Sequence, residues 1–172
     1  MPRRSSKPPT GSAYEAGVGL LARRAHSRAE LRRKLARRGF DGEDVDGALA
    51  RLSGLGYLDD ASFAAGHVRR RSATVGPLAL SAELSARGVD RAVAGAALDA
   101  FDRPAQVTAA TRLAERLFAP LAQRLAARGQ PAGYRELLDS VGAKLLRRGF
   151  SMAVARAACD AVWRGTARTP EA

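Results

Sequence analysis

The sequence has few of the residues that most enzyme sites and disulfide scaffolds need. Its 172 residues include one cysteine and two histidines. One cysteine cannot form an internal disulfide. His26 and His67 stand alone, without the cluster of Cys, His and acidic residues that a zinc site needs. A phosphate-binding loop of the GxxxxGKS type is also missing. We therefore expect a binding protein and not an enzyme, with no cofactor or metal.

Long hydrophobic runs are also missing. No run approaches the roughly 20 apolar residues of a membrane-spanning helix. The first 13 residues lack the apolar centre of a signal peptide. The expected location is the cytoplasm, without membrane contact.

Lysine is scarce, although the chain is strongly basic. Of 29 basic residues, 26 are arginine, and the net charge is +12. Such a charge implies an anionic partner, either nucleic acid or an acidic protein surface. The charge is concentrated in residues 23–38, which contain eight basic residues and Glu30 as the one acidic residue. The net charge of +12 treats both histidines as neutral.

A 22-residue pattern occurs three times, at residues 31–52, 80–101 and 141–162. Its first copy has Leu31 and Leu35 on one helix face, followed by the pair Arg38-Gly39. A glycine directly after a helix closes the last turn in the left-handed conformation, and the next residue packs back onto the helix. Asp41 can then cap a second helix. Corresponding turns lie at Arg87-Gly88 and Arg148-Gly149.

A further helix precedes each copy. Ser27 and Glu30 have the spacing of a capping box, which predicts that the helix carrying Leu31 begins at Ser27. The predicted fold is all-α, with three tandem three-helix repeats that form an elongated, curved array. The predicted segments are a disordered basic N-terminal arm (1–12), repeats at 13–58, 59–102 and 103–165, and a flexible C-terminus (166–172).

The pattern also predicts which side chains face the core. For the helix over residues 13–24 these are Tyr14, Val18 and Leu21. In the third repeat, a long helix interrupted by Pro120 is expected before a middle helix that starts near Tyr134. The predicted core of the last helices is Val45, Ala48, Leu49 and Leu52, then Ala94, Ala97, Leu98 and Phe101, then Ala155, Ala158, Cys159 and Val162.

The three repeats act as controls for one another. A residue present in all of them serves the fold, whereas a residue found in one repeat is available for function. Arg38, Arg87 and Arg148 recur at helix C-termini, where a cation is favourable, and are interpreted first as structural. The candidate binding residues are Arg28, Arg32, Arg33 and Arg37, followed by Arg69, Arg70, Arg71, Lys144 and Arg147. A merely solvated face is an equally good interpretation of the first four.

Four motifs together resemble the RecX family of bacterial recombination regulators. They are HSRAELRRKLARRGFD at residues 26–41, LGYLDDASFA at 55–64, GP followed by ELSARGVD, and KLLRRGFS at 144–151. The resemblance extends from Tyr14 to Val162. It implies a protein of three-helix repeats that binds RecA and the RecA–single-stranded-DNA filament. We expect the protein to be a monomer.

The resemblance also implies a function. Family members inhibit the ATPase, strand-exchange and coprotease activities of RecA, and so modulate recombination, DNA repair and the SOS response. The basic residues named above are then the expected filament contacts. Both DNA phosphates and acidic RecA side chains remain open as the groups that they meet.

An alternative function is sequence-tolerant DNA binding by helix-turn-helix-like repeats. A recognition helix of that kind carries base-reading side chains at its start. Here the second helix of the first repeat starts with Asp41-Gly-Glu-Asp44, which would repel phosphates. The sequence therefore disfavours major-groove reading but leaves binding to the DNA backbone open.

Overall fold

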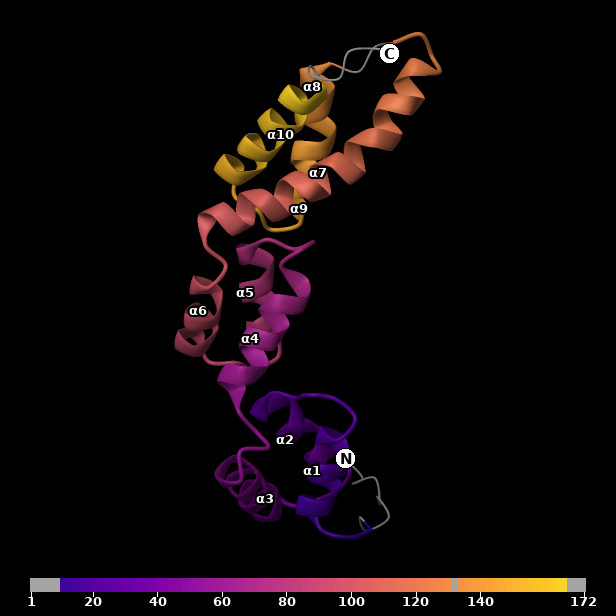
Figure 1. Cartoon of the computed structure of the whole chain (residues 1–172). Helices are drawn as coiled ribbons and strands as arrows, with labels where there is room; N and C mark the ends of the chain where they lie inside the picture. The colour runs from indigo at the N-terminus through magenta and orange to yellow at the C-terminus, as the bar shows by residue number, and fades with distance from the viewer. Residues whose placement is uncertain (1–9, 131–132, 167–172) are drawn as a thin grey trace, which may run out of the picture. The chain divides into compact units, whose positions relative to one another are not determined.

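A computed structural model describes residues 10–130 and 133–166 of the chain. Every regular element in these ranges is helical (Figure 1). This confirms the predicted all-α helical repeat fold. The predicted disordered arm falls mostly, and the predicted flexible C-terminus almost entirely, outside the described residues.

The described residues divide into two compact units. The first contains the described residues up to Gly66 together with Leu84–Ala94, and the second contains His67–Glu83 together with the described residues from Gly95 onward. Residues of the predicted second repeat, 59–102, thus belong to both units. The three repeat boundaries stay predictions.

The first unit contains α1 (Ala13–Leu21), α2 (Arg28–Arg37) and α3 (Gly42–Gly54), and α3 packs against both other helices. Leu31 and Leu35 of α2 are fully buried. The four residues predicted to face the core from α3 are buried as well, which confirms that prediction. They are Val45, Ala48, Leu49 and Leu52.

The prediction for α1 was wrong at Val18, which is 41% exposed, whereas Gly17 and Leu20 are buried. Gly17 packs against the Leu52 side chain of α3. A Cβ atom on Gly17 would lie 2.8 Å from Cδ1 of Leu52. A side chain at this core-facing position would require Leu52 to shift, so the glycine fits here while Val18 points outward.

Two serines cap the helices of the first unit. Ser12, predicted to lie in the disordered arm, forms a full capping box with Glu15 at the start of α1. Ser27 forms only half of the predicted box: its Oγ accepts from the Glu30 N–H at 3.0 Å. The Glu30 carboxylate is instead held by Arg24 and Arg87.

Three helices contribute residues to both units: α4 (Asp60–Arg71), α5 (Pro77–Ala86) and α6 (Arg91–Asp99). Asp59 caps α4 by accepting from the N–H groups of Ala61 (3.0 Å) and Ser62 (3.1 Å). Asp60 accepts from the Arg28 N–H at 2.7 Å and so stabilises the start of α2. In the third helix of the predicted second repeat, Ala94 and Phe101 are buried as predicted, but Ala97 and Leu98 are only partly buried.

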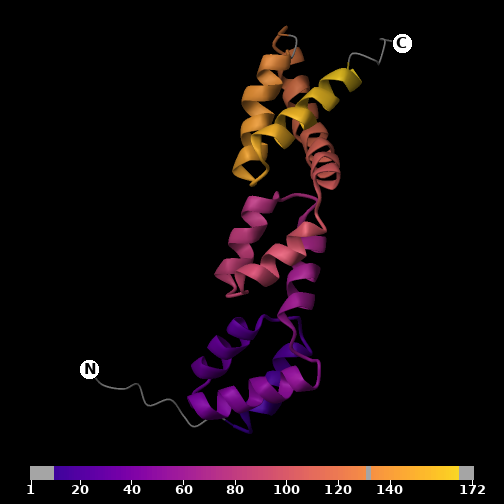
Figure 2. The ribbon, with the colours of Figure 1, turned by 90° about the vertical axis from the view of Figure 1, so that its left-hand side faces the viewer.

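The second unit is built around α7 (Arg103–Ala126) and α10 (Met152–Thr166), which pack against each other (Figure 2). The predicted interruption at Pro120 was wrong, because α7 continues through it. The predicted core residues of α10 are all buried. Cys159 is fully buried, which confirms its interpretation as a core residue, and burial raises the pKa of its thiol to about 11.

The middle helix of the third repeat is irregular. It consists of α8 (Tyr134–Glu136), the π-helical segment η1 (Leu137–Gly142) and α9 (Ala143–Arg147). Its start confirms the prediction that it begins near Tyr134. The Tyr134 hydroxyl donates a hydrogen bond to the Asp160 carboxylate of α10, and this bond raises the pKa of the tyrosine.

The three predicted glycine turns are present. Gly39, Gly88 and Gly149 have φ angles of 92°, 77° and 84°. The outer bond of a Schellman ending joins Val89 N to Leu84 O (3.1 Å) and Phe150 N to Leu145 O (3.2 Å). A bond from Gly39 N to Ala36 O (3.0 Å) closes the last turn of α2.

Two of these turns also contact the start of another helix, and we call each such contact a joint. In the first unit, Ser27 Oγ donates to the Arg87 carbonyl at 2.6 Å, and a Cβ atom on Gly88 would lie 2.4 Å from the Ala29 Cβ. In the second unit, Gly76 N donates to the Arg148 carbonyl at 2.8 Å. The two Arg-Gly pairs therefore stabilise the contact between helices as well as ending their own.

None of the described helices combines the length and the apolar character needed to span a membrane.

The joint in the second unit should tolerate no side chain at Gly76. Its Cβ atom would lie 2.3 Å from Phe150 N, a backbone atom that cannot move aside easily. We expect Gly76→Ala to reduce the free energy of unfolding by about 1–3 kcal/mol, as overpacking does. Urea denaturation measures this loss.

The matched control is Gly47→Ala in the exposed interior of α3, where an added Cβ atom meets nothing within 4 Å. Its free energy of unfolding should rise by about 0.5–1 kcal/mol, because alanine loses less backbone entropy on folding than glycine does. Equal effects of the two substitutions would contradict the close approach at Gly76.

Candidate functional site

The basic residues of α2 fall on two sides of its buried leucines. On the side facing α3, Arg28 NH1 donates to Ser53 Oγ at 2.9 Å, and Arg32 forms an ion pair with the Asp46 carboxylate. Arg32 and Asp46 are about half exposed, with side-chain exposures of 50% and 55%. A pair this exposed contributes only about 0–1 kcal/mol, but it partly neutralises this side.

The other side of α2 forms a basic pocket. We call it the α2 pocket; its lining residues are Arg24, Glu30, Arg33, Lys34, Ala36 and Arg37. Arg33 is held by two backbone carbonyls, those of Ala29 at 3.2 Å and Ala86 at 3.4 Å. Among the described residues, Lys34 and Arg37 form no ion pair or side-chain hydrogen bond.

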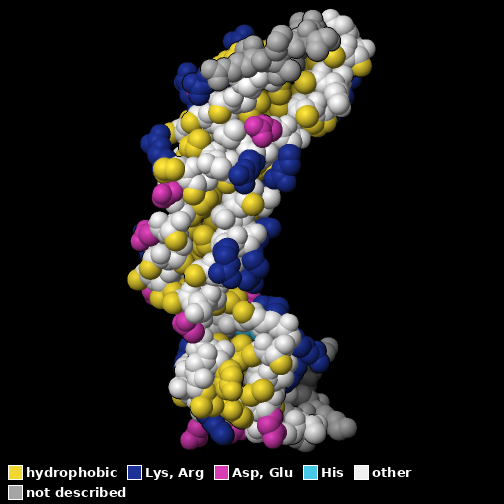
Figure 3. Space-filling model, in the orientation of Figure 1, with side chains coloured by type: hydrophobic (Ala, Val, Ile, Leu, Met, Phe, Trp, Pro, Cys, Tyr) yellow, Lys and Arg dark blue, Asp and Glu magenta, His cyan; other side chains and the backbone are white. Residues whose placement is uncertain are grey.

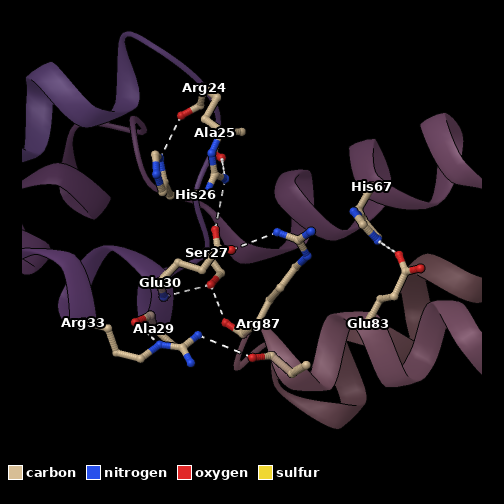
Figure 4. A network of polar contacts seen from close by, with 11 residues as sticks. Arg24, Ala25, His26, Ser27, Ala29, Glu30, Arg33, His67, Glu83 and Arg87 are labelled. Atoms are coloured by element: carbon tan, nitrogen blue, oxygen red, sulfur yellow. Dashed lines mark hydrogen bonds and ion pairs between the residues drawn. The ribbon is translucent and has the colours of Figure 1, made fainter.

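Glu30 is the acidic residue of the pocket, and its charge is already paired. Its Oε2 lies 3.2 Å from Arg24 NH1 and its Oε1 lies 2.8 Å from Arg87 NH1 (Figure 4). Burial alone would raise the pKa of Glu30, but Arg24 and Arg87 outweigh it and hold that pKa below its ordinary value. The carboxylate therefore stays ionised at neutral pH, and the pocket keeps a net positive charge.

His26 supports the loop that carries Arg24. It is 3% exposed, and its Nδ1 lies 2.9 Å from the Arg24 carbonyl (Figure 4). Burial lowers the pKa of this histidine, so the ring is neutral at pH 7 and its Nδ1–H donates to the carbonyl. Its Nε2 has no hydrogen-bond partner among the described atoms.

The predicted cluster of three arginines on α4 is divided. Arg71 forms two hydrogen bonds with Glu83, at 3.0 and 3.4 Å, and Glu83 also lies 2.6 Å from His67 Nε2 (Figure 4). The hydrogen bond from Arg71 lowers the pKa of Glu83. Arg71 therefore has a structural role, whereas Arg69 and Arg70 are exposed and unpaired within the described ranges.

The third predicted cluster lies on α9. Lys144 is partly buried and Arg147 is exposed, and neither forms an ion pair with a described residue. Basic side chains form several separate patches on the face drawn in Figure 3. The structure thus brings Arg33 and Arg37 together in one pocket and places Arg28 and Arg32 on another side of α2.

Sequence reasoning missed two residues of the pocket. Arg24 lies in the loop before α2, so helical spacing could not place it, and Lys34 was passed over between Arg33 and Arg37. Together these cations can hold an anionic group, because guanidinium and ammonium groups form charge-assisted hydrogen bonds with phosphate and carboxylate. Within the described residues, no group of three His, Cys, Asp or Glu side chains could hold a metal ion.

Family models match two parts of the chain. The RecX first three-helix domain matches residues 13–52, and the RecX second three-helix domain matches residues 59–98. The chain is 36% identical, over 148 residues, to Regulatory protein RecX of Stenotrophomonas maltophilia strain R551-3, covering 86% of this chain and 85% of the relative. It is 41% identical to the protein of strain K279a over 100 residues, or 58% of this chain. That alignment spans 61% of the relative's length, less than two thirds.

Two solved structures have a similar fold. RecX from Lactobacillus salivarius superposes with a TM-score of 0.75 and 25% identity, covering 88% of this chain and 95% of that one. A second structure, of regulatory protein RecX, gives a TM-score of 0.72 and 28% identity, covering 86% and 71%.

Removing the charge of Glu30 should destabilise the first unit in a pH-dependent way. Because its pKa is lowered in the folded protein, the stability that it contributes is present above the unfolded pKa of about 4.3. It is lost as the pH falls through the lower folded pKa. Glu30→Gln should therefore cost about 1–3 kcal/mol at neutral pH and progressively less in acid.

Urea denaturation at about pH 7 and about pH 3 measures this difference. Glu115→Gln is the control, because Glu115 is exposed on α7 and forms no ion pair with a described residue. A loss for Glu30→Gln that stayed the same at both pH values would rule out its ion pairs as the source.

Proposed function

The chain belongs to the RecX family of regulatory proteins, and from this premise we propose that it binds RecA and the RecA–single-stranded-DNA filament. In this proposal it inhibits the ATPase, strand-exchange and coprotease activities of RecA without catalysing a reaction itself. Recombination and DNA repair are the processes modulated. The family relationship supports the choice of partner, and the net charge of +12 suits a polyanion.

The observation that carries the proposal is the α2 pocket. It presents Lys34 and Arg37, which have no partner among the described residues, beside the two held arginines Arg24 and Arg33. Unpaired cations next to each other repel, so this arrangement gains stability only when an anion binds. A DNA phosphate or an acidic RecA side chain supplies that anion.

Major-groove reading by α3 is a weaker alternative. The start of α3 is acidic, with Glu43 and Asp44 in its first turn and Asp41 as its cap. Asp41 accepts from the Asp44 N–H at 2.8 Å, so its carboxylate stabilises the helix. Sequence-tolerant binding of the DNA backbone by α2 remains the second candidate function.

The first experiment is a titration of the single-stranded-DNA-dependent ATPase of the cognate RecA at fixed, saturating DNA. We expect inhibition at well below one protein per RecA, too little protein to cover the DNA. This result supports a regulator of the filament. Inhibition that begins only when the DNA itself is saturated would favour the second candidate function.

The two sides of α2 should contribute unequally to this inhibition. Replacing Lys34 and Arg37 together with Ala removes both unpaired cations of the pocket, while the described fold loses no ion pair. We expect about a tenfold higher concentration for half-maximal inhibition, the equivalent of about 1.4 kcal/mol. The melting temperature should change little.

The matched control replaces Arg28 and Arg32 with Ala, an equal change of charge on the same helix. Their partners are Ser53 and Asp46, so this variant should lose some stability and less than about threefold in inhibition. Equal loss of inhibition in both double variants would mean that total charge, and not the pocket, determines binding.

A further inference from the structure

An Arg-Gly turn contacts the start of another helix at two places in the described chain. At each joint, a carbonyl at the C-terminal end of a middle helix accepts a hydrogen bond from the start of another middle helix. The donors are Ser27 Oγ to the Arg87 carbonyl at 2.6 Å and Gly76 N to the Arg148 carbonyl at 2.8 Å. The two ends attract each other, because a helix C-terminus is partly negative and an N-terminus partly positive.

The missing side chain of the turn glycine makes room for the incoming helix. A Cβ atom on Gly88 would lie 2.4 Å from the Ala29 Cβ, and one on Gly149 would lie 2.4 Å from Ala79 N. Ala29 is the second residue of α2 and Ala79 the third residue of α5. The joint therefore requires a small residue near the start of the incoming helix as well as a glycine in the turn.

The joint in the first unit adds charge complementarity. Glu30, the third residue of α2, forms an ion pair with Arg87 at 2.8 Å. The incoming helix thus has three features: a hydroxyl cap (Ser27), a small second residue (Ala29) and a glutamate in third place. Each of them contacts the Arg87-Gly88 turn.

The third copy of this turn, Arg38-Gly39 at the end of α2, has no such helix on it among the described residues. Gly39 likewise has a positive φ, 92°, and Arg38 is exposed. No described donor reaches the Arg38 carbonyl. We propose that the Arg38-Gly39 turn binds the N-terminus of an α-helix of a partner protein that has the three features of α2, namely a Ser or Thr cap, a small second residue and a glutamate in third place.

A second copy of the chain does not fit this description. Among the described helices, those with a free hydroxyl cap are α1, which begins after Ser12, and α10, which begins after Ser151. Tyr14 is the second residue of α1 and too large, and Val154 is the third residue of α10 and uncharged. We therefore commit to another protein as the occupant, on the pattern of the joint in the first unit.

The joint in the second unit lacks the three features, because Gly76 precedes α5 and Leu78 is its second residue, so a crosslink to a second copy of this chain is an outcome that would overturn the choice.

This inference rests on the proposed function, because that function names RecA as the partner protein to be tested. The α2 pocket serves an anionic group, whereas the Arg38-Gly39 turn serves a helix of the protein. The two surfaces can therefore be separated by mutation.

Two variants block the turn in different ways. Arg38→Glu reverses the charge that pairs with the glutamate. Gly39→Asn places a side chain where the docking helix would lie, and asparagine tolerates the left-handed conformation, so the turn itself persists. The controls are Arg164→Glu, on the exposed end of α10, and Gly56→Asn, at φ of 74° with nothing within 4 Å of its Cβ.

The measurement is the affinity of the full-length variants for the RecA–single-stranded-DNA filament, with melting temperatures as a check on folding. We expect Arg38→Glu and Gly39→Asn to bind at least about tenfold more weakly, and both controls to lose less than about threefold. Affinities equal to that of the unmodified chain would overturn the inference and leave the proposed function standing. Failure of the unmodified chain to bind the filament would refute the proposed function and this inference with it.

A crosslinking experiment tests the occupant. A photoreactive residue in place of Gly42, an exposed position beside the turn where an added Cβ atom meets nothing within 4 Å, should crosslink to the first turn of a RecA helix that has the three features. Crosslinks confined to other kinds of RecA segment, or to DNA, would overturn the assignment of a helix N-terminus.

Discussion

The close approach of backbones at the Arg-Gly turns is the constraint on which the rest of the structure depends. At Gly88 and Gly149 no Cβ atom fits between the turn and the neighbouring helix, and both residues adopt positive φ. The same glycine therefore ends one helix and admits the start of another. Because both functions need the same residue, the sequence repeats its turn more faithfully than its helix surfaces.

The joints also determine which cations are available for binding. Arg87 is held by Glu30, and Arg148 donates to the Thr74 carbonyl at 3.3 Å, so both serve the fold. Arg38 occupies the matching position and forms no ion pair with a described residue. Recurrence in the sequence marked all three as structural, and the contacts support this interpretation for the two that lie at joints.

The sequence predicted the features that depend on residues near one another in the chain. The paired leucines, the glycine turns and the cap at Asp41 are of this kind. The wrong prediction at Val18 involves a distant residue, because Leu52 lies against Gly17. The wrong predictions at Pro120 and Ser12 are local: α7 continues through its proline, and Ser12 caps α1. The α2 pocket needs Arg24, which only the loop geometry brings to α2.

The charge distribution of α2 connects the fold with the proposed function. A helix that carries Arg33, Lys34 and Arg37 on one side is weakened by repulsion between like charges. Glu30 relieves some of this repulsion, but its two oxygens are already shared between Arg24 and Arg87. The remaining positive charge conflicts with the local rules for a stable helix, and such conflicts are expected where a surface serves binding. An anionic partner removes the conflict, because it supplies the negative charge that the described fold leaves out.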